Sequence, residues 1–155
     1  ELADNANNDI YTVSVGNNYT FSGVNLISTK FSYLEKDAKA DYNAYNGSSF
    51  NIGYTRVLPF GTLKLEKTLQ RNIYDSRNDF VNTTINRKDD IDISRIQLSG
   101  KITQLIPFID KFDPKGLIFY NMSFTEIDSD STLLNNTAIR QTTSFNIVKR
   151  FSLYE

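Results

Sequence analysis

Histidine, cysteine and tryptophan are absent from this chain, and the first two absences narrow its chemistry. Without cysteine there can be no disulfide bond and no thiol catalysis. Without histidine, the chain lacks the commonest general base and the commonest metal ligand. We therefore expect a protein that is not an enzyme and that holds no cofactor and no metal ion.

Long apolar runs and an excess of one charge are also missing. No stretch of about 20 apolar residues occurs, which excludes a membrane-spanning helix but not membrane-spanning strands. The 17 basic and 18 acidic residues are spread along the chain, so no basic patch indicates a nucleic acid partner. The 3 prolines are few, whereas the 9 tyrosines and 11 phenylalanines favour β-strands.

The feature that the sequence does contain is an alternation of apolar and polar residues, which restarts seven times. A period of two is typical of a β-strand with one apolar and one polar face. The alternation predicts seven strands, over residues 10–21, 24–36, 49–58, 62–74, 91–106, 117–127 and 138–154.

The predicted connections alternate between short and long. Short ones fall at 22–23, 59–61 and 108–116, and long polar ones at 37–48, 75–90 and 128–136. Transmembrane β-barrels show this asymmetry, because their periplasmic turns are short and their extracellular loops are long. We therefore expect an all-β fold, an antiparallel up-and-down transmembrane β-barrel in the outer membrane of a Gram-negative bacterium, with residues 1–155 as one domain.

The predicted strand number is odd, whereas bacterial barrels contain an even number of strands. If the last strand ends in the periplasm, residues 1–9 form an extracellular loop segment. Either one strand is missed by the pattern, or the chain is part of a larger barrel. We expect the second, with a second chain or an N-terminal segment of the same precursor completing the wall.

The alternation assigns each strand residue to lipid or to the lumen. The predicted lipid-facing residues are Ile96, Leu98, Ile102, Ile118, Tyr120, Met122, Phe124, Phe145 and Ile147. The predicted lumen-lining residues are Lys30, Lys64, Glu66, Arg95, Gln97 and Lys101. Lys67 and Arg71 interrupt the apolar face of their strand, so they must either extend to the membrane surface or follow a bulge that changes the register.

Two other interpretations use the same residues. A soluble β-sandwich or a lipocalin-like binding module would turn the apolar face inward and the polar face to water.

The acid-rich stretches at 89–92 and 128–131 lack the spacing of a calcium loop and are expected to be solvated loops. Glu66 and Glu126 could form a catalytic carboxylate pair only if the fold brought them together.

A set of turns and strand ends in the second half of the chain resembles one family. It comprises Arg77-Asn78-Asp79, the stretch from Arg87 to Asp90, the turn from Pro114 to Gly116, the stretch from Asp128 to Ser131, and the strand end from Val148 to Phe151. Over roughly residues 60–151, this pattern is similar to the C-terminal end of the surface lipoprotein assembly modifiers and related barrels. Those proteins carry periplasmic tetratricopeptide repeats before a fourteen-stranded barrel. The chain departs from the usual aromatic end of such barrels by continuing to Glu155, with Tyr154 as the penultimate residue.

The resemblance implies seven strands of a fourteen-stranded barrel and a role in protein secretion. The expected function is transport of a client, such as a surface lipoprotein, across the outer membrane. The expected partners are outer-membrane lipid, the segment that completes the barrel and a protein client. Because the predicted lumen carries both signs of charge, we expect no narrow selectivity for one ionic sign.

Overall fold

The computed structural model describes residues 8–38, 44–74, 87–113, 115–132 and 137–150. The predicted extracellular segment 1–9 therefore lies outside the described residues up to residue 7, as do Arg77-Asn78-Asp79, Phe151 and Tyr154. Much of the three predicted long loops lies outside them too, in the gaps 39–43, 75–86 and 133–136.

Seven strands form one antiparallel sheet in which each strand pairs with its neighbours in the sequence. The strands are β1 (Asn8–Phe21), β2 (Asn25–Ala38), β3 (Tyr45–Leu58), β4 (Gly61–Tyr74), β5 (Lys88–Lys101), β6 (Ile118–Ser131) and β7 (Ala138–Lys149). β1 and β7 are the two edges, and they do not pair with each other, so the sheet is open. The sequence prediction of seven antiparallel, up-and-down strands is confirmed.

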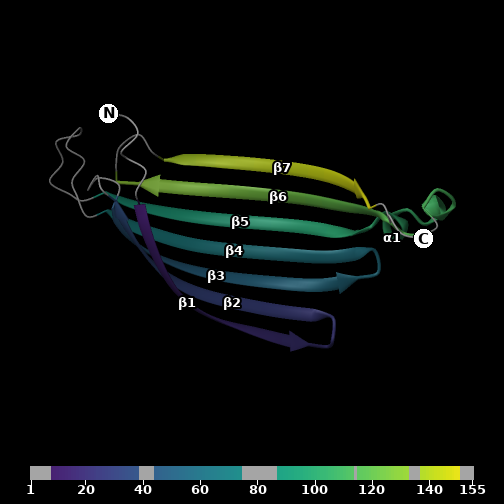
Figure 1. Cartoon of the computed structure of the whole chain (residues 1–155), viewed down its shortest axis with the longest axis horizontal. Helices are drawn as coiled ribbons and strands as arrows, with labels where there is room; N and C mark the ends of the chain where they lie inside the picture. Colours follow the sequence, from purple (N-terminus) through teal and green to yellow (C-terminus); the bar gives the residue numbers. More distant parts are fainter. Residues whose placement is uncertain (1–7, 39–43, 75–86, 114, 133–136, 151–155) are drawn as a thin grey trace.

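The β1–β2, β3–β4 and β5–β6 connections lie at one end of the sheet, here called the turn end (Figure 1). The first two are tight turns, but the third spans residues 102–117 and contains α1 (Ile102–Leu105) and η4 (Pro107–Lys111). The other three connections, residues 39–44, 75–87 and 132–137, join the strands at the opposite end, the loop end. The predicted alternation of short and long connections is therefore wrong at the β5–β6 connection, which is the longest of the six because the chain forms two helical turns there. Among the described residues, no helix is long and apolar enough to cross a membrane.

The predicted strand boundaries need correction at both ends of β5. The strand ends at Lys101, because the chain then enters α1 and the backbone N–H of Lys101 donates to the Gln104 side chain over 3.0 Å. The acid-rich stretches 89–92 and 128–131 are not loops. They belong to β5 and β6, where Asp89 pairs with Ser131 and Asp92 with Asp128 in the ladder.

Burial is inverted relative to a soluble sheet. On β4, the apolar-side positions from Leu65 to Ile73 are exposed, whereas the polar-side positions from Lys64 to Tyr74 are half-buried or buried. Side chains crowd on the concave side of a curved sheet and spread apart on its convex side. The alternation therefore places the polar face on the concave side, and we call the two sides the polar concave face and the apolar convex face.

Few hydrophobic side chains are buried anywhere in the described residues: Ala44, Ile102 and Tyr120. Tyr120, at 1 % exposure, fills a gap left by two glycines. It pairs with Gly100 across the β5–β6 ladder, and its hydroxyl donates to the carbonyl oxygen of Phe60, the residue before Gly61. A Cβ on Gly61 would lie 2.5 Å from the Ser99 carbonyl oxygen, and Gly61 has φ of +149°, so only glycine fits this position.

Candidate functional site

The apolar convex face is the first candidate surface, and most of the predicted lipid-facing residues lie on it. The ladder places Ile96 opposite Phe124, Leu98 opposite Met122, and Met122 opposite Phe145. Ile118 and Ile147 belong to the same face. Large apolar side chains stay strongly exposed here, at 50 % for Ile96, 56 % for Phe145 and 57 % for Ile147. An uncovered apolar surface of this extent marks a contact with lipid or with another macromolecule.

Two predicted lipid-facing residues are wrong. Ile102 lies in α1, not in a strand, and is only 6 % exposed. Tyr120 has the predicted face, but its ring is buried over Gly100 and beside Gly61. Neither side chain reaches the surface that would meet lipid.

The apolar band on the convex face runs diagonally across the sheet. The cross-strand row that begins at Val15 passes through Phe31, Phe50 and Leu69, and then meets Asp92 and Asp128. The row that begins at Phe145 passes through Met122, Leu98 and Leu63, and then meets Arg56 and Asn25. Each row is apolar over its first four strands and then polar on the next two. The Val15 row becomes polar towards β7, and the Phe145 row becomes polar towards β1.

The slope of the band follows from the register. The row through Val15 reaches β7 at Ile139, whereas the apolar pair on β7, Phe145 and Ile147, is centred about seven residues further along the strand. At about 3.4 Å per residue, this shift is about 24 Å, over six strand spacings of about 4.8 Å, or about 29 Å. The band therefore crosses the strands about 40° away from the cross-strand direction.

Polar residues bound the band on both sides of the same face. On β2 the flanking residues are Asn25 and Glu35, and on β3 they are Arg56 and Asn46. Ten residues separate each pair, which is about 34 Å along a strand and about 26 Å when projected at a 40° tilt. That height matches the apolar belt of an outer-membrane barrel, about 25 Å.

Lys67 and Arg71 keep their places on the convex face without a bulge. The β3–β4 and β4–β5 ladders are continuous through both residues. Lys67 pairs with Asp92 at 2.5 Å, and Arg71 makes two hydrogen bonds to Asp90, at 2.6 and 3.0 Å. The apparent misfits are therefore cross-strand ion pairs: Lys67 lies within the band, between Leu65 and Leu69, and bonds Asp92 towards the loop end, whereas Arg71 and Asp90 lie nearer that end.

The polar concave face carries all six predicted lumen-lining residues. Glu66 bonds Lys64 at 2.9 Å and faces Arg95 at 3.8 Å, and Arg95 also contacts the Thr125 hydroxyl at 3.4 Å. Gln97 donates to Asn121 over 3.0 Å. Lys30 lies opposite Asn51 on β3, and Lys101 lies opposite Phe119 at the turn end. Glu126 belongs to the convex face, so it cannot form a carboxylate pair with Glu66.

The concave face continues with neutral hydrogen-bonded pairs, and it also has a small apolar part. Ser123 and Ser144 share a hydrogen bond of 2.8 Å, and Asn51 donates to Thr68 over 2.7 Å. Ile93 and Ile127 pair with each other nearer the loop end. This face therefore offers water many donors and acceptors and both signs of charge, with no group of three or more acidic side chains among the described residues that could hold a metal ion.

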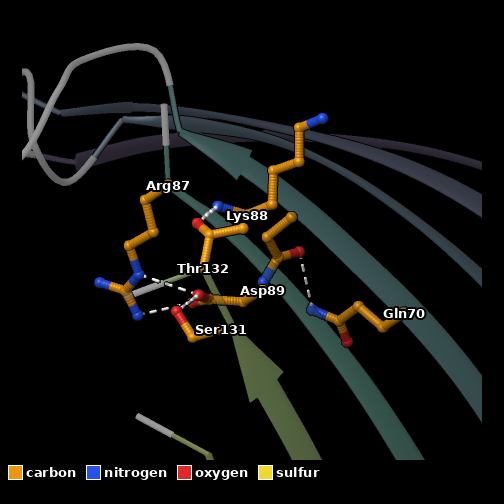
Figure 2. Close-up of polar contacts among 7 residues, drawn as sticks. Gln70, Arg87, Lys88, Asp89, Ser131 and Thr132 are labelled. Carbon is orange, nitrogen blue, oxygen red and sulfur yellow. Dashed lines mark hydrogen bonds and ion pairs between the residues drawn. The ribbon is translucent and has the colours of Figure 1, made fainter. Parts of the chain in front are cut away.

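A hydrogen-bonded cluster closes the concave face at the loop end, and Figure 2 shows its arrangement. Arg87 makes two hydrogen bonds to Asp89, at 2.9 and 2.5 Å, and the Ser131 hydroxyl donates to the same carboxylate over 2.6 Å. The Arg87 guanidinium also lies 4.3 Å from the centre of the Tyr74 ring. The hydrogen bond to Asp89 raises the pKa of Arg87, so this cation stays charged. The cluster therefore links β4, β5 and β6 at the loop end of the sheet.

Comparison of the chain with family models, with curated proteins and with solved structures yields no match. The functional argument therefore depends on the two faces and on the register that joins their strands.

Proposed function

We propose that this chain forms part of the wall of a transmembrane β-barrel in a bacterial outer membrane. The apolar convex face contacts lipid, and the polar concave face lines a water-filled lumen. One observation carries the proposal: the apolar band slopes at about 40° to the cross-strand direction, and strands in such barrels are tilted by about 35–45°. A band that lies level in a bilayer must slope by this angle across its own strands.

The rival interpretation is a soluble β-sandwich or a lipocalin-like module. Lipocalins enclose an apolar ligand, so their apolar side chains line the concave side of the sheet. Here the apolar side chains are the exposed ones, and the concave face carries Lys64, Glu66, Arg95 and Gln97. A sandwich would need a second layer over the convex face, and it would have no reason to keep a band that slopes across the strands.

The strand directions define what must complete the barrel. β1 and β7 both run from the loop end to the turn end (Figure 1), so direct pairing between them would be parallel. An antiparallel barrel needs an odd number of further strands between these two edges. A second copy in the same membrane orientation would also add seven strands. Its edge strands, however, would run from the loop end to the turn end as β1 and β7 do, so both junctions would be parallel. We therefore propose that a different segment, with an odd number of strands, completes the wall.

The proposed activity is passage of a client through the completed barrel. The resemblance to surface lipoprotein assembly modifiers extends this to a secreted protein, including a surface lipoprotein. The concave face supports passage of a polar client, because its donors and acceptors belong to paired side chains that stay solvated. The mixture of Lys64, Glu66 and Arg95 gives no single sign of charge to select for.

Adjacent single cysteines on β6 test the two faces, and the absence of native cysteine makes the labelling specific. In the lipid-inserted chain, Ser123→Cys is expected to react with a charged, membrane-impermeant thiol reagent. Met122→Cys is expected to resist that reagent and to react with a maleimide dissolved in the bilayer. Reaction yields for the two variants with both reagents, measured by mass spectrometry, check the assignment. Resistance of Met122→Cys to both reagents would indicate a protein core behind the convex face and would overturn the proposal.

A further inference from the structure

The connection between β5 and β6, residues 102–117, displays two aromatic rings that no other described part of the chain covers. Phe108 is 77 % exposed and Phe112 is 78 % exposed, the highest values among the large hydrophobic residues described. They are four residues apart, at η4 and its C-terminal cap. We call this connection the rim segment, and Figure 1 shows it extending past the turn-end limits of β5 and β6.

The rim segment is held in place, so the exposure of its rings does not reflect a lack of local structure. Ile102 is buried, and its carbonyl oxygen accepts a hydrogen bond from the Ile106 N–H at 2.8 Å. Asp113, at 4 % exposure, accepts hydrogen bonds from the backbone N–H groups of Leu117 and Ile118, both at 2.8 Å. The segment therefore presents Phe108 and Phe112 from a hydrogen-bonded frame.

The rim segment and the strand ends that flank it also carry a surplus of positive charge. Exposed basic residues there are Lys101, Lys111, Lys115, Lys149 and Arg150. The rim segment contains two acidic residues, Asp110 and Asp113. Asp113 is buried, and its carboxylate accepts the two backbone hydrogen bonds described above. On the convex face towards the loop end, acidic residues outnumber basic ones. The acidic residues are Asp90, Asp92, Glu126, Asp128 and Asp130, and the basic ones are Lys67, Arg71 and Lys88.

The sloping band sets the depth of the rim segment. Ile118 is the first residue of β6. If the strands are tilted by about 40° to the membrane normal, Ile118 lies about 11 Å along that normal from the centre of the band, towards the turn end. Half the height of the apolar belt is about 12 Å. The rim segment directly precedes Ile118, so it lies at the level of the lipid headgroups.

From these observations we propose that the rim segment is a lipid-surface anchor for the leaflet at the turn end. Phe108 and Phe112 enter the boundary between headgroups and acyl chains, and Lys111 and Lys115 of the same segment attract anionic phosphate groups. Aromatic and basic side chains together are what such a surface binds. This inference rests on the proposed barrel, because it needs the strands to be inserted in lipid.

Tryptophan fluorescence tests the anchor, since the chain has no tryptophan of its own. Phe112→Trp is placed in the full chain, and the barrel that the chain forms with the segment completing its wall is inserted into phosphatidylcholine vesicles with or without phosphatidylglycerol. The emission is expected to shift to shorter wavelength and to be quenched more by a headgroup-level spin label than by bromine at the middle of the acyl chains. The shift is expected to be larger with phosphatidylglycerol, and Lys111→Gln with Lys115→Gln is expected to remove that difference.

A second position separates failure of the anchor from failure of the barrel. Phe145→Trp lies within the band and reports insertion of the strands. If Phe145→Trp is quenched by mid-acyl bromine while Phe112→Trp keeps the emission of a residue in water, the anchor is wrong and the surface is left for a protein partner. If both variants keep aqueous emission, the barrel itself is wrong.

Discussion

Replacement of Tyr120 by alanine is expected to destabilise the lipid-inserted chain by about 3–5 kcal/mol, the range for removing a buried aromatic side chain. Tyr120 is 1 % exposed, and its ring occupies the space beside Gly100 and Gly61. Alanine leaves that space empty, because neither glycine can fill it. Urea titration of the chain in lipid vesicles, followed by circular dichroism, measures the change in unfolding free energy.

Tyr120→Phe is the matched control for the ring. It keeps the packing and removes only the hydrogen bond to the Phe60 carbonyl oxygen, so a smaller loss of about 0.5–1.5 kcal/mol is expected. If the alanine and phenylalanine variants lose equal stability, the ring does not support the turn end, and its burial beside the two glycines has no structural role.

Ile96→Arg is expected to destabilise the inserted chain by about 2–4 kcal/mol, the penalty for a cation near the bilayer midplane of a barrel. Ile96 is 50 % exposed on the convex face and lies close to the centre of the sloping band. No acidic residue lies directly opposite a guanidinium at this position, because Ile96 lies between Leu65 and Phe124 in the ladder. The same urea titration in vesicles measures this change.

Two controls bracket the effect of Ile96→Arg. Gln97→Arg places the charge on the concave face and is expected to lose about one hydrogen bond, roughly 0.5–1.5 kcal/mol. Ile139→Arg keeps the charge on the convex face, where Ile139 is 69 % exposed, but outside the band, where the penalty falls to about 0–1 kcal/mol. Equal effects at Ile96 and Ile139 would mean that depth in the band has no energetic meaning.

The strands could be predicted because their signal is local. The alternation between Ile118 and Thr125 lies within one strand, and it correctly assigned Met122 and Ser123 to opposite faces. The face shared by Lys30, Lys64 and Arg95 was predicted for the same reason, since each strand reports its own alternation. Ile102 was misassigned because its apolar residue type continues the strand pattern while the backbone has already entered α1.

The remaining errors concern residues whose partners lie on other strands. Tyr120 is buried only because Gly100 on β5 and Gly61 on β4 leave room for its side chain. Lys67 and Arg71 looked like misfits because Asp92 and Asp90 are separated from them by a whole connection. The slope of the band is invisible in any single strand, because it depends on the register of all six ladders. Pairing across strands is what the sequence pattern could not provide.

The depth of three single tryptophans in a bilayer tests the sloping band most directly. Val15 and Ile139 belong to the same cross-strand row, whereas Phe145 lies in a different row but within the band. At a tilt of about 40°, Ile139 lies about 18 Å from the level of Val15, and Phe145 lies within about 3 Å of it. With Val15→Trp, Ile139→Trp and Phe145→Trp in vesicles of lipids brominated at known depths, we predict that the tryptophans at 15 and 145 are quenched most by mid-acyl bromine. The tryptophan at 139 is predicted to escape that quenching. Equal depth for positions 15 and 139, or no quenching at any of the three positions, would contradict a tilted transmembrane wall.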